Sequence, residues 1–169
     1  LEALANTEVV VCDKTGTLTE GIFKVQNINA IGYSKEELLR YATYAESFSN
    51  HPISNSLKQA YGKEIDDKLV SETQEISGKG VKALVDNKKV LVGNKKLMKE
   101  YNIKFEKSQD TGTVAYVAIN NEFAGKILIA DKIKEDSYKA IKLLKENNIK
   151  KIIMLTGDRE NISASIANN

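Results

Sequence analysis

The chain has 169 residues, with 25 Lys and Arg against 23 Asp and Glu and an apolar fraction of 41%. This length suffices for one ordinary domain or two small ones with a real hydrophobic core. A single Cys excludes an intrachain disulfide scaffold, and a net charge of +2 without a basic arm gives no support for nucleic-acid binding.

The sequence has no apolar run near the roughly 18–20 residues that cross a bilayer, so we expect a soluble chain. It begins without Met and ends at Asn169 within a predicted helix, so we interpret it as part of a longer protein. The first predicted element is the apolar run Val9–Cys12, which suits a parallel strand buried on both faces and ends at Asp13.

Two helices and two hairpins are predicted next. Helical spacing covers 34–48, where Ser34 and Glu37 form a capping-box signature, and 52–61, where Pro52 suits the helix start. Alternating strands then surround Asp86-Asn87 (81–85 and 90–92) and Asn120-Asn121 (114–119 and 123–129), and such turn residues predict antiparallel hairpins.

The last segment repeats the pattern of the first, an apolar strand followed by a polar loop with an acidic residue. Residues 136–148 show amphipathic helical spacing with Asn148 as the stop, and the apolar run Ile152–Leu155 predicts a second buried strand. The two ends of the chain therefore form one parallel α/β domain (residues 1–20 and 131–169). An α+β module with an antiparallel sheet (residues 21–130) is inserted into it.

The stretch Asp13-Lys14-Thr15-Gly16-Thr17-Leu18-Thr19 follows the first predicted strand. A carboxylate at the carboxyl end of such a strand lies where open α/β sheets bind ligands, and a loop of small residues brings backbone N–H groups near phosphate oxygens. Asp13 is therefore a candidate nucleophile for a phosphoryl group, assisted by a divalent cation. The alternative is a surface turn whose Asp, Thr and Gly serve turn geometry.

This heptapeptide resembles DKTGT, the phosphorylation motif of P-type ATPases within the wider haloacid dehalogenase-like superfamily. The resemblance implies that ATP phosphorylates Asp13 and that Mg2+ is held by its carboxylate and by the backbone carbonyl of Thr15. Lys14, Thr15 and Thr17 would stabilise the transferring charge. Many members of the superfamily have a general-acid Asp at the position of Thr15, so the acyl phosphate here should hydrolyse slowly.

Two later segments extend the resemblance. Thr156-Gly157-Asp158 is similar to the family's TGD motif, in which the Thr and Gly would hold the phosphoryl group and the Asp would support the Mg2+ and nucleotide region. Asp131 and Lys134 stand where relatives often have Asp, two residues and Arg. Asp131 would help to close the hinge or catalytic edge, and Lys134 would replace the Arg, although without its guanidinium fork. The alternative for Asp131 is a charge that favours the N-terminus of the next helix.

The inserted module resembles the nucleotide-binding module of the heavy-metal (P1B) subgroup. Glu46 and His51 keep the five-residue spacing of that subgroup's Glu and Ser-Glu-His-Pro motif, although Asn50 replaces the motif's own Glu. The resemblance implies that Glu46 accepts from the adenine amino group and that His51 packs against or hydrogen-bonds the base.

Two glycine-containing segments complete the resemblance to this subgroup. Ser77-Gly78-Lys79-Gly80-Val81 matches its GxGV segment, and Val92-Gly93-Asn94 matches its later Gly-Asn. Gly78, Gly80, Val81, Gly93 and Asn94 are therefore expected in the nucleotide pocket, since glycine lets a flat base or ribose approach the main chain. The alternative is that these glycines serve only a bend and a strand exit.

We therefore predict an incomplete haloacid dehalogenase-like phosphorylation domain with an inserted nucleotide-binding domain. The resemblance implies the ATP-binding, autophosphorylating unit of a metal pump, with ATP and Mg2+ as cofactors, on the cytoplasmic side of a membrane. Its partners would be the transmembrane and actuator domains of the full-length parent. Copper is the first expectation for the transported ion, and zinc, cadmium or cobalt stay open.

The family's distal GDGxND segment, with the carboxylate that completes the Mg2+ shell, is absent from the chain, so the chain alone is expected to turn over poorly. Two alternatives stay open. A soluble phosphatase with a large cap would hydrolyse small phosphomonoesters rapidly and should prefer an acid at position 15. A non-enzymatic nucleotide-binding module would bind ATP without forming an acyl phosphate.

Overall fold

The computed structural model describes residues 7–106, 112–147 and 149–155. The chain divides into two compact units, one ending at Ile22 and resuming at Asp131, the other spanning Phe23–Ala130. It passes between them within two long strands, β2 (Thr19–Ala30) and β7 (Glu122–Ile133). Across these described ranges, no helix has both the length and the apolar character needed to cross a membrane.

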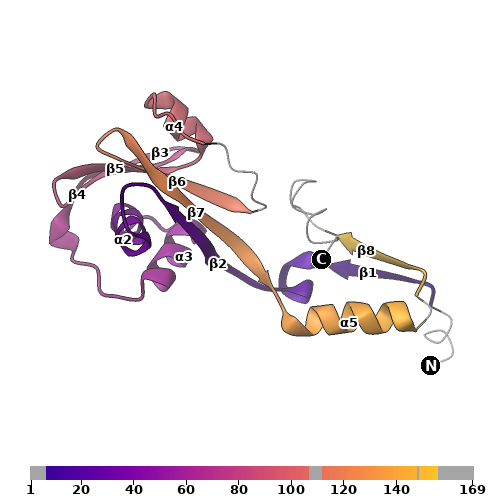
Figure 1. The fold of residues 1–169 in the computed structure, drawn as a ribbon. Helices are drawn as coiled ribbons and strands as arrows, with labels where there is room; N and C mark the ends of the chain where they lie inside the picture. The colour runs from indigo at the N-terminus through magenta and orange to yellow at the C-terminus, as the bar shows by residue number, and fades with distance from the viewer. Residues whose placement is uncertain (1–6, 107–111, 148, 156–169) are drawn as a thin grey trace. The chain divides into compact units, whose positions relative to one another are not determined.

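The central unit, Phe23–Ala130, is built on a six-stranded sheet in the order β2-β7-β6-β5-β4-β3 (Figure 1). Pairing from β3 through to β7 is antiparallel, which confirms the antiparallel sheet of the prediction. Strands β2 and β3 have no counterpart among the predicted strands. The remaining strands are β3 (Val70–Ile76), β4 (Gly80–Val85), β5 (Lys88–Gly93) and β6 (Thr113–Ile119).

Both predicted hairpins are present, and their turns have left-handed backbone. Asp86 and Asn87 have φ values of 52° and 60°, and Asn120 and Asn121 have values of 50° and 67°. Two-residue hairpin turns of this kind need positive φ at both central positions, which Asn and Asp tolerate better than other residues with a Cβ. These turns set the register of β4 with β5 and of β6 with β7.

Helices cover both faces of this sheet. Figure 1 shows α2 (Lys35–Ala45) and α3 (Pro52–Tyr61) on one face and α4 (Lys95–Glu100), which was not predicted, on the other. The capping box is present: the Glu37 N–H donates to Ser34 Oγ over 3.1 Å, and the Ser34 N–H donates to the Glu37 carboxylate over 2.8 Å. Helix α2 ends at Ala45, earlier than the predicted position 48, because the chain turns there toward α3.

Residue alternation along the strands produces two apolar cores. Val90 and Val92 of β5 face α2 and α3, whereas Leu91 between them faces α4. Strand β6 repeats this pattern, with Val117 on the first face and Tyr116 on the second. Because successive side chains on a strand point to opposite faces, one strand serves both cores.

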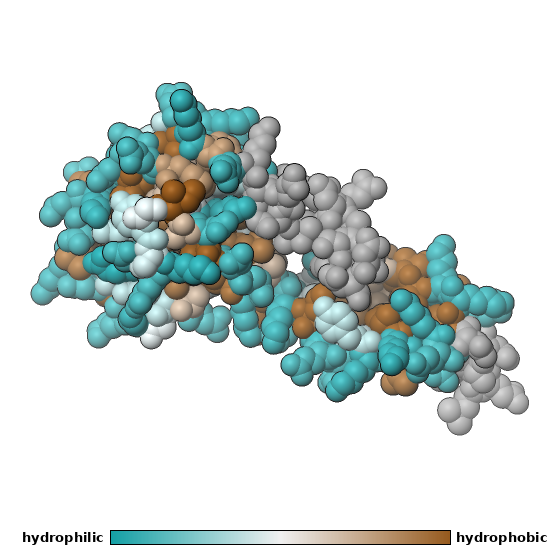
Figure 2. Space-filling model, in the orientation of Figure 1, coloured by the Kyte–Doolittle hydropathy of each residue, from teal (hydrophilic) through white to brown (hydrophobic). Residues whose placement is uncertain are grey.

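The terminal unit contains the predicted parallel pair. Strand β1 (Val9–Asp13) lies beside β8 (Lys151–Leu155), and Asp13 is opposite Leu155 in the register. The expectation that β1 is buried on both faces is wrong, because Val9 is 48% exposed and Val11 53% exposed. Among the described residues this sheet has only two strands, and apolar atoms are visible on the surface of this unit in Figure 2.

The predicted amphipathic helix of this unit is α5 (Glu135–Glu146). Its C-cap is Asn147, whose backbone N–H donates to Leu143 O over 3.0 Å, so the C-cap lies one residue before the predicted stop. Asn148 itself lies outside the described residues. Glu135 and Asp136 in its first turn are placed favourably for the helix dipole.

Replacing Leu38 by Ala tests the larger core. Leu38 of α2 has no exposed surface, so the variant loses buried apolar area and leaves a cavity against the sheet. We expect the free energy of unfolding in urea to fall by about 2–5 kcal/mol. Ile31, which is 52% exposed, is the matched control, and Ile31→Ala should change it by less than about 0.5 kcal/mol. Equal effects of the two substitutions would contradict this account of the core.

Candidate functional site

Asp13 ends strand β1, and its carboxylate is exposed at the carboxyl end of the parallel pair. Asp13 Oδ1 accepts a hydrogen bond of 2.9 Å from the backbone N–H of Lys14. The following loop has extended backbone at Thr15 and a left-handed conformation at Gly16 (φ 81°). Thr15 and Thr17 are exposed beside Asp13 in sequence, whereas the Lys14 side chain is buried. A direct contact of Lys14 with a phosphoryl group therefore stays a prediction.

The loop is held from behind by a fully buried hydroxyl. Thr19 Oγ1 lies 3.1 Å from the carbonyl oxygen of Lys14 and 2.5 Å from Asp131 Oδ2, and it accepts from the Gly16 N–H over 3.3 Å. Asp131 Oδ1 is buried without a hydrogen-bond partner among the described residues. Asp131 lies in β7 rather than in the first turn of α5, so its contact is with the loop and not with the helix N-terminus.

Two residues that follow Asp131 bind the same loop through its backbone. Lys134 Nζ donates to Gly16 O over 2.7 Å, and the Lys134 N–H donates to Leu18 O over 3.0 Å. The Ser137 hydroxyl also donates to Leu18 O, over 2.8 Å. Sequence reasoning singled out Asp131 and Lys134 but missed Ser137, whose place at the start of an amphipathic helix carried no distinctive signal.

Both proposed Mg2+ ligands lie within the described residues. Asp13 and the Thr15 carbonyl lie in the described loop, whereas Thr156-Gly157-Asp158 lie outside the described residues. Over the described ranges, no three His, Cys, Asp or Glu side chains gather as they would in a self-contained metal site. The residues present fit a cation that is bound by one carboxylate and a carbonyl and is otherwise held by the substrate and water.

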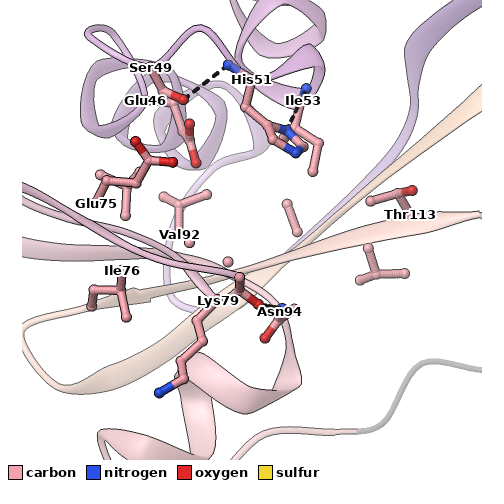
Figure 3. Close-up of a pocket in the computed structure, with 16 residues that line it drawn as sticks. Glu46, Ser49, His51, Ile53, Glu75, Ile76, Lys79, Val92, Asn94 and Thr113 are labelled. Carbon is pink, nitrogen blue, oxygen red and sulfur yellow. Dashed lines mark hydrogen bonds between the residues drawn. The ribbon is translucent and has the colours of Figure 1, made fainter.

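The central unit contains a cleft between the loop that joins α2 to α3 and the sheet (Figure 3). All seven residues predicted to bind nucleotide line it: Glu46, His51, Gly78, Gly80, Val81, Gly93 and Asn94. The lining residues that sequence reasoning missed are Ser49, Ile53, Glu75, Ile76, Lys79, Val92 and Thr113–Ala115. Most of these lie on strands where no single residue type signals a site.

Glu46 is the C-cap of α2 and is 5% exposed. Its Oε2 atom has no hydrogen-bond partner among the described residues, although it lines the cleft. Burial raises the pKa of this carboxyl to about 7, and the nearby charge of Glu75 adds to the shift, while Ser49 and Lys58 oppose it. A buried polar atom without a partner is costly, so Glu46 is a site where a ligand donor would be stabilised.

His51 is fixed by the start of the next helix. Its Nδ1 accepts a hydrogen bond of 3.2 Å from the Ile53 N–H as the N-cap of α3, and its own N–H donates to Ser49 Oγ. Because Nδ1 is an acceptor, the neutral ring carries its proton on Nε2. Nε2 is thus the ring atom left to meet a ligand.

The glycines bring two strands into close contact. Gly80 and Gly93 are paired across β4 and β5, and a Cβ on Gly80 would lie 2.1 Å from Val92 O, while one on Gly93 would lie 2.2 Å from Lys79 O. No side chain fits at either position. Gly78 (φ 67°) turns the chain between β3 and β4. Glycine is therefore required at positions 80 and 93 by the backbone packing, and these residues also form part of the cleft wall.

Asn94 shapes the cleft through hydrogen bonds within the protein. Its Oδ1 accepts from the N–H groups of Lys96 and Leu97 at the start of α4, and its Nδ2 donates to Gly78 O over 2.8 Å. Its backbone N–H also donates to Lys79 O over 2.8 Å. Asn94 therefore ties the Gly78 turn to α4, and its side chain has little capacity left for a ligand.

Residues 7–169 match the haloacid dehalogenase-like hydrolase family, so the chain belongs to that family. Within it, the chain matches the catalytic segment of heavy-metal P-type ATPases. It is 44% identical, over 99% of its length, to a zinc-transporting ATPase of Synechocystis, and 44% identical, over 98%, to a cadmium, zinc and cobalt-transporting ATPase of Bacillus subtilis. It is 36% identical, over 98%, to a copper-exporting P-type ATPase B of Archaeoglobus fulgidus.

Solved structures agree with this placement and confirm the predicted fold class. The chain superposes with a TM-score of 0.80, at 28% identity, on a zinc-transporting PIB-type ATPase, covering 99% of this chain and 28% of that one. The TM-score is 0.68, at 26% identity, for the catalytic domain of a CPx-ATPase, of which the chain covers 61%. The chain spans about a quarter of the length of the curated relatives, 23% and 24% for the two at 44% identity.

Replacing Thr19 by Val tests the support of the loop. The variant keeps the side-chain shape but removes the hydroxyl that contacts Asp131 and accepts from the Gly16 N–H. Loss of about 1–3 kcal/mol of local stability should speed hydrogen exchange of the Gly16 amide about 5- to 150-fold. Thr17→Val at an exposed position is the control and should leave that exchange rate nearly unchanged. Unaltered exchange in Thr19→Val would contradict the assigned support.

Proposed function

We propose that this chain is the ATP-binding and autophosphorylating segment of a heavy-metal transporting P-type ATPase. The central unit binds ATP, and the terminal unit presents Asp13 to its γ-phosphate. The observation that carries the proposal is the cleft that gathers all seven predicted nucleotide residues around the unpartnered Glu46 Oε2. The similarity to metal-transporting ATPases over nearly the whole chain supports the assignment.

In the cleft, adenine is held between the polar edge formed by Glu46 and His51 and the floor formed by the glycine strands. A Glu46 oxygen accepts from the adenine amino group, which removes the cost of the buried unpartnered atom. The Nε2–H of His51 contacts the base or ribose from the same side of the cleft. The bare backbone at Gly80 and Gly93 leaves a flat floor for the nucleoside.

At the loop, Asp13 attacks the γ-phosphorus and ADP leaves with the electron pair of the broken P–O bond. Mg2+ would be held by the Asp13 carboxylate and the Thr15 carbonyl, and it supplies positive charge that offsets the phosphate oxygens. Thr17, Thr156, Gly157 and Asp158 hold the phosphoryl oxygens and the nucleotide end of the site. Thr15 offers no carboxyl group for acid–base catalysis of hydrolysis, so the acyl phosphate persists.

The transported ion is proposed from the relatives. Relatives at 44% identity are named for zinc or for cadmium, zinc and cobalt, whereas the copper-exporting relative of Archaeoglobus fulgidus is 36% identical. This difference favours a zinc, cadmium or cobalt cargo over copper, the first expectation from the sequence. In the full-length parent, the partners are membrane-spanning and actuator domains, and the chain lies on the cytoplasmic side.

Substitutions at the cleft test nucleotide binding by this chain. Glu46→Ala removes the base acceptor, and His51→Asn keeps an N-cap for α3 but removes Nε2. Each should weaken ATP binding about 5- to 30-fold, as expected for 1–2 kcal/mol, in isothermal titration. Glu64→Ala, an exposed site outside the cleft, is the control for lost charge. Unchanged affinity in both cleft variants would remove the nucleotide-site assignment.

Phosphorylation at Asp13 is tested in the full-length parent. Incubation with γ-labelled ATP and Mg2+, followed by acid quench, should give a labelled protein that hydroxylamine releases, because an acyl phosphate is cleaved by that nucleophile. Asp13→Asn should abolish the label. Label that resists hydroxylamine, or that survives in Asp13→Asn, contradicts the mechanism. Rapid hydrolysis of small phosphomonoesters would favour the phosphatase alternative.

A further inference from the structure

A second carboxylate faces Glu46 across the cleft. Glu75 lies near the end of β3, paired with Val81 of β4, and Figure 3 shows its carboxyl turned toward that of Glu46. The two differ in environment, because Glu75 is exposed whereas Glu46 is 5% exposed and leaves Oε2 without a partner. Two facing carboxylates repel each other when both are ionised, and the buried one gains more from holding a proton.

The other charged and polar groups in and near the cleft do not fully neutralise Glu46 and Glu75. Lys58 of α3 acts on Glu46 with positive charge, but its Nζ lies 3.5 Å from the Ser49 carbonyl oxygen, to which it donates. Lys79 of the β3–β4 turn is paired with Glu100 over 2.5 Å. His51, from the N-terminus of α3, uses Nδ1 as an acceptor. Ser49, in the loop after α2, hydrogen-bonds the Glu46 side chain and favours its ionised form.

The protonation state of a carboxyl group in the cleft decides which base it can hydrogen-bond. A neutral acid offers one C=O acceptor and one O–H donor, which match the amino group and N1 of adenine. An ionised carboxylate offers two acceptors, which match the N1–H and amino group of guanine. Against adenine, one of these acceptors would face the N1 lone pair, which is repulsive. A base whose donors and acceptors are mismatched in a buried site loses affinity strongly.

We propose that Glu75 is a specificity-determining residue of this cleft: it keeps Glu46 protonated, and the neutral Glu46 selects adenine over guanine. This rests on the proposed function, in which the cleft binds ATP. Burial is the larger cause of the raised pKa of Glu46, about 7, and Glu75 extends it. The direction of the pH dependence follows: adenine binding is strongest well below pH 7 and weakens as pH rises through 7, whereas guanine binding strengthens.

The test is the ratio of ATP to GTP affinity for the 169-residue chain, measured by isothermal titration from pH 5.5 to 8.5. The ratio cancels the titration of the phosphates, which both nucleotides share. In the unaltered chain it should be highest at low pH and should fall above pH 7. In Glu75→Gln the pKa of Glu46 should fall, and we expect the ratio at pH 7.5 to decrease by roughly 3- to 10-fold. Glu64→Gln should leave it unchanged.

A second variant separates failure of this inference from failure of the proposed function. Glu46→Gln has an amide whose C=O and N–H mimic the neutral acid, so it should keep ATP affinity within about threefold and make the ratio independent of pH. The 13C shift of the Glu46 carboxyl gives its titration directly and should move to lower pH in Glu75→Gln.

Each outcome has a distinct reading. One outcome overturns the proposal on Glu75: Glu46→Gln weakens ATP binding as Glu46→Ala and His51→Asn do, and ATP affinity rises with pH. In that case Glu46 binds the base as an ionised acceptor. An ATP to GTP ratio that is the same in Glu75→Gln as in the unaltered chain also overturns it. If none of the cleft variants alters ATP affinity, the proposed function itself fails.

Discussion

The cleft depends on the close approach of two backbones, at Gly80 of β4 and Gly93 of β5. Any Cβ at either position would lie within 2.2 Å of a carbonyl oxygen, that of Val92 in β5 or that of Lys79 just before β4, so this contact exists only between glycines. Asn94, the next residue, holds the geometry by joining the Gly78 turn to the N-terminus of α4. The wall of the cleft is therefore main chain rather than side chain, which suits the face of a flat ligand.

Opposite this wall, the polar edge comes from helix ends. Glu46 caps the C-terminus of α2 and His51 caps the N-terminus of α3, so the spacing of five residues reflects a short loop between two helices. The folding of the loop uses His51 Nδ1 and the Glu46 carbonyl, which accepts from Ser54 Oγ over 2.7 Å. Glu46 Oε2 remains buried and unpartnered. The proposed ligand would supply the missing hydrogen-bond donor.

Sequence reasoning succeeded where local chemistry decides the structure. The Ser34–Glu37 capping box, the Asn120-Asn121 turn and the apolar run into Asp13 are each specified by neighbours in the chain. It failed for β3, whose interior residues are exposed on an edge strand that exists only through its pairing with β4. Glu75 was missed with it, since nothing local places that carboxyl beside Glu46. The burial of β1 was overestimated because an apolar run does not reveal how many strands flank it.

The loop after β1 and the cleft are organised in the same way. The loop backbone is held by hydrogen bonds from Thr19, Lys134 and Ser137. Each of the contacts Thr19–Asp131, Lys134–Gly16 and Ser137–Leu18 joins residues more than a hundred positions apart in the chain. Asp13 and the Thr15 and Thr17 side chains then remain exposed on the other side. At the cleft, Asn94 is likewise consumed by the scaffold while Glu46 is left for a ligand. In both places, the groups that hold the backbone in position are different from the groups left accessible to a ligand. A substitution among the first is expected to alter the local structure, and a substitution among the second is expected to alter binding.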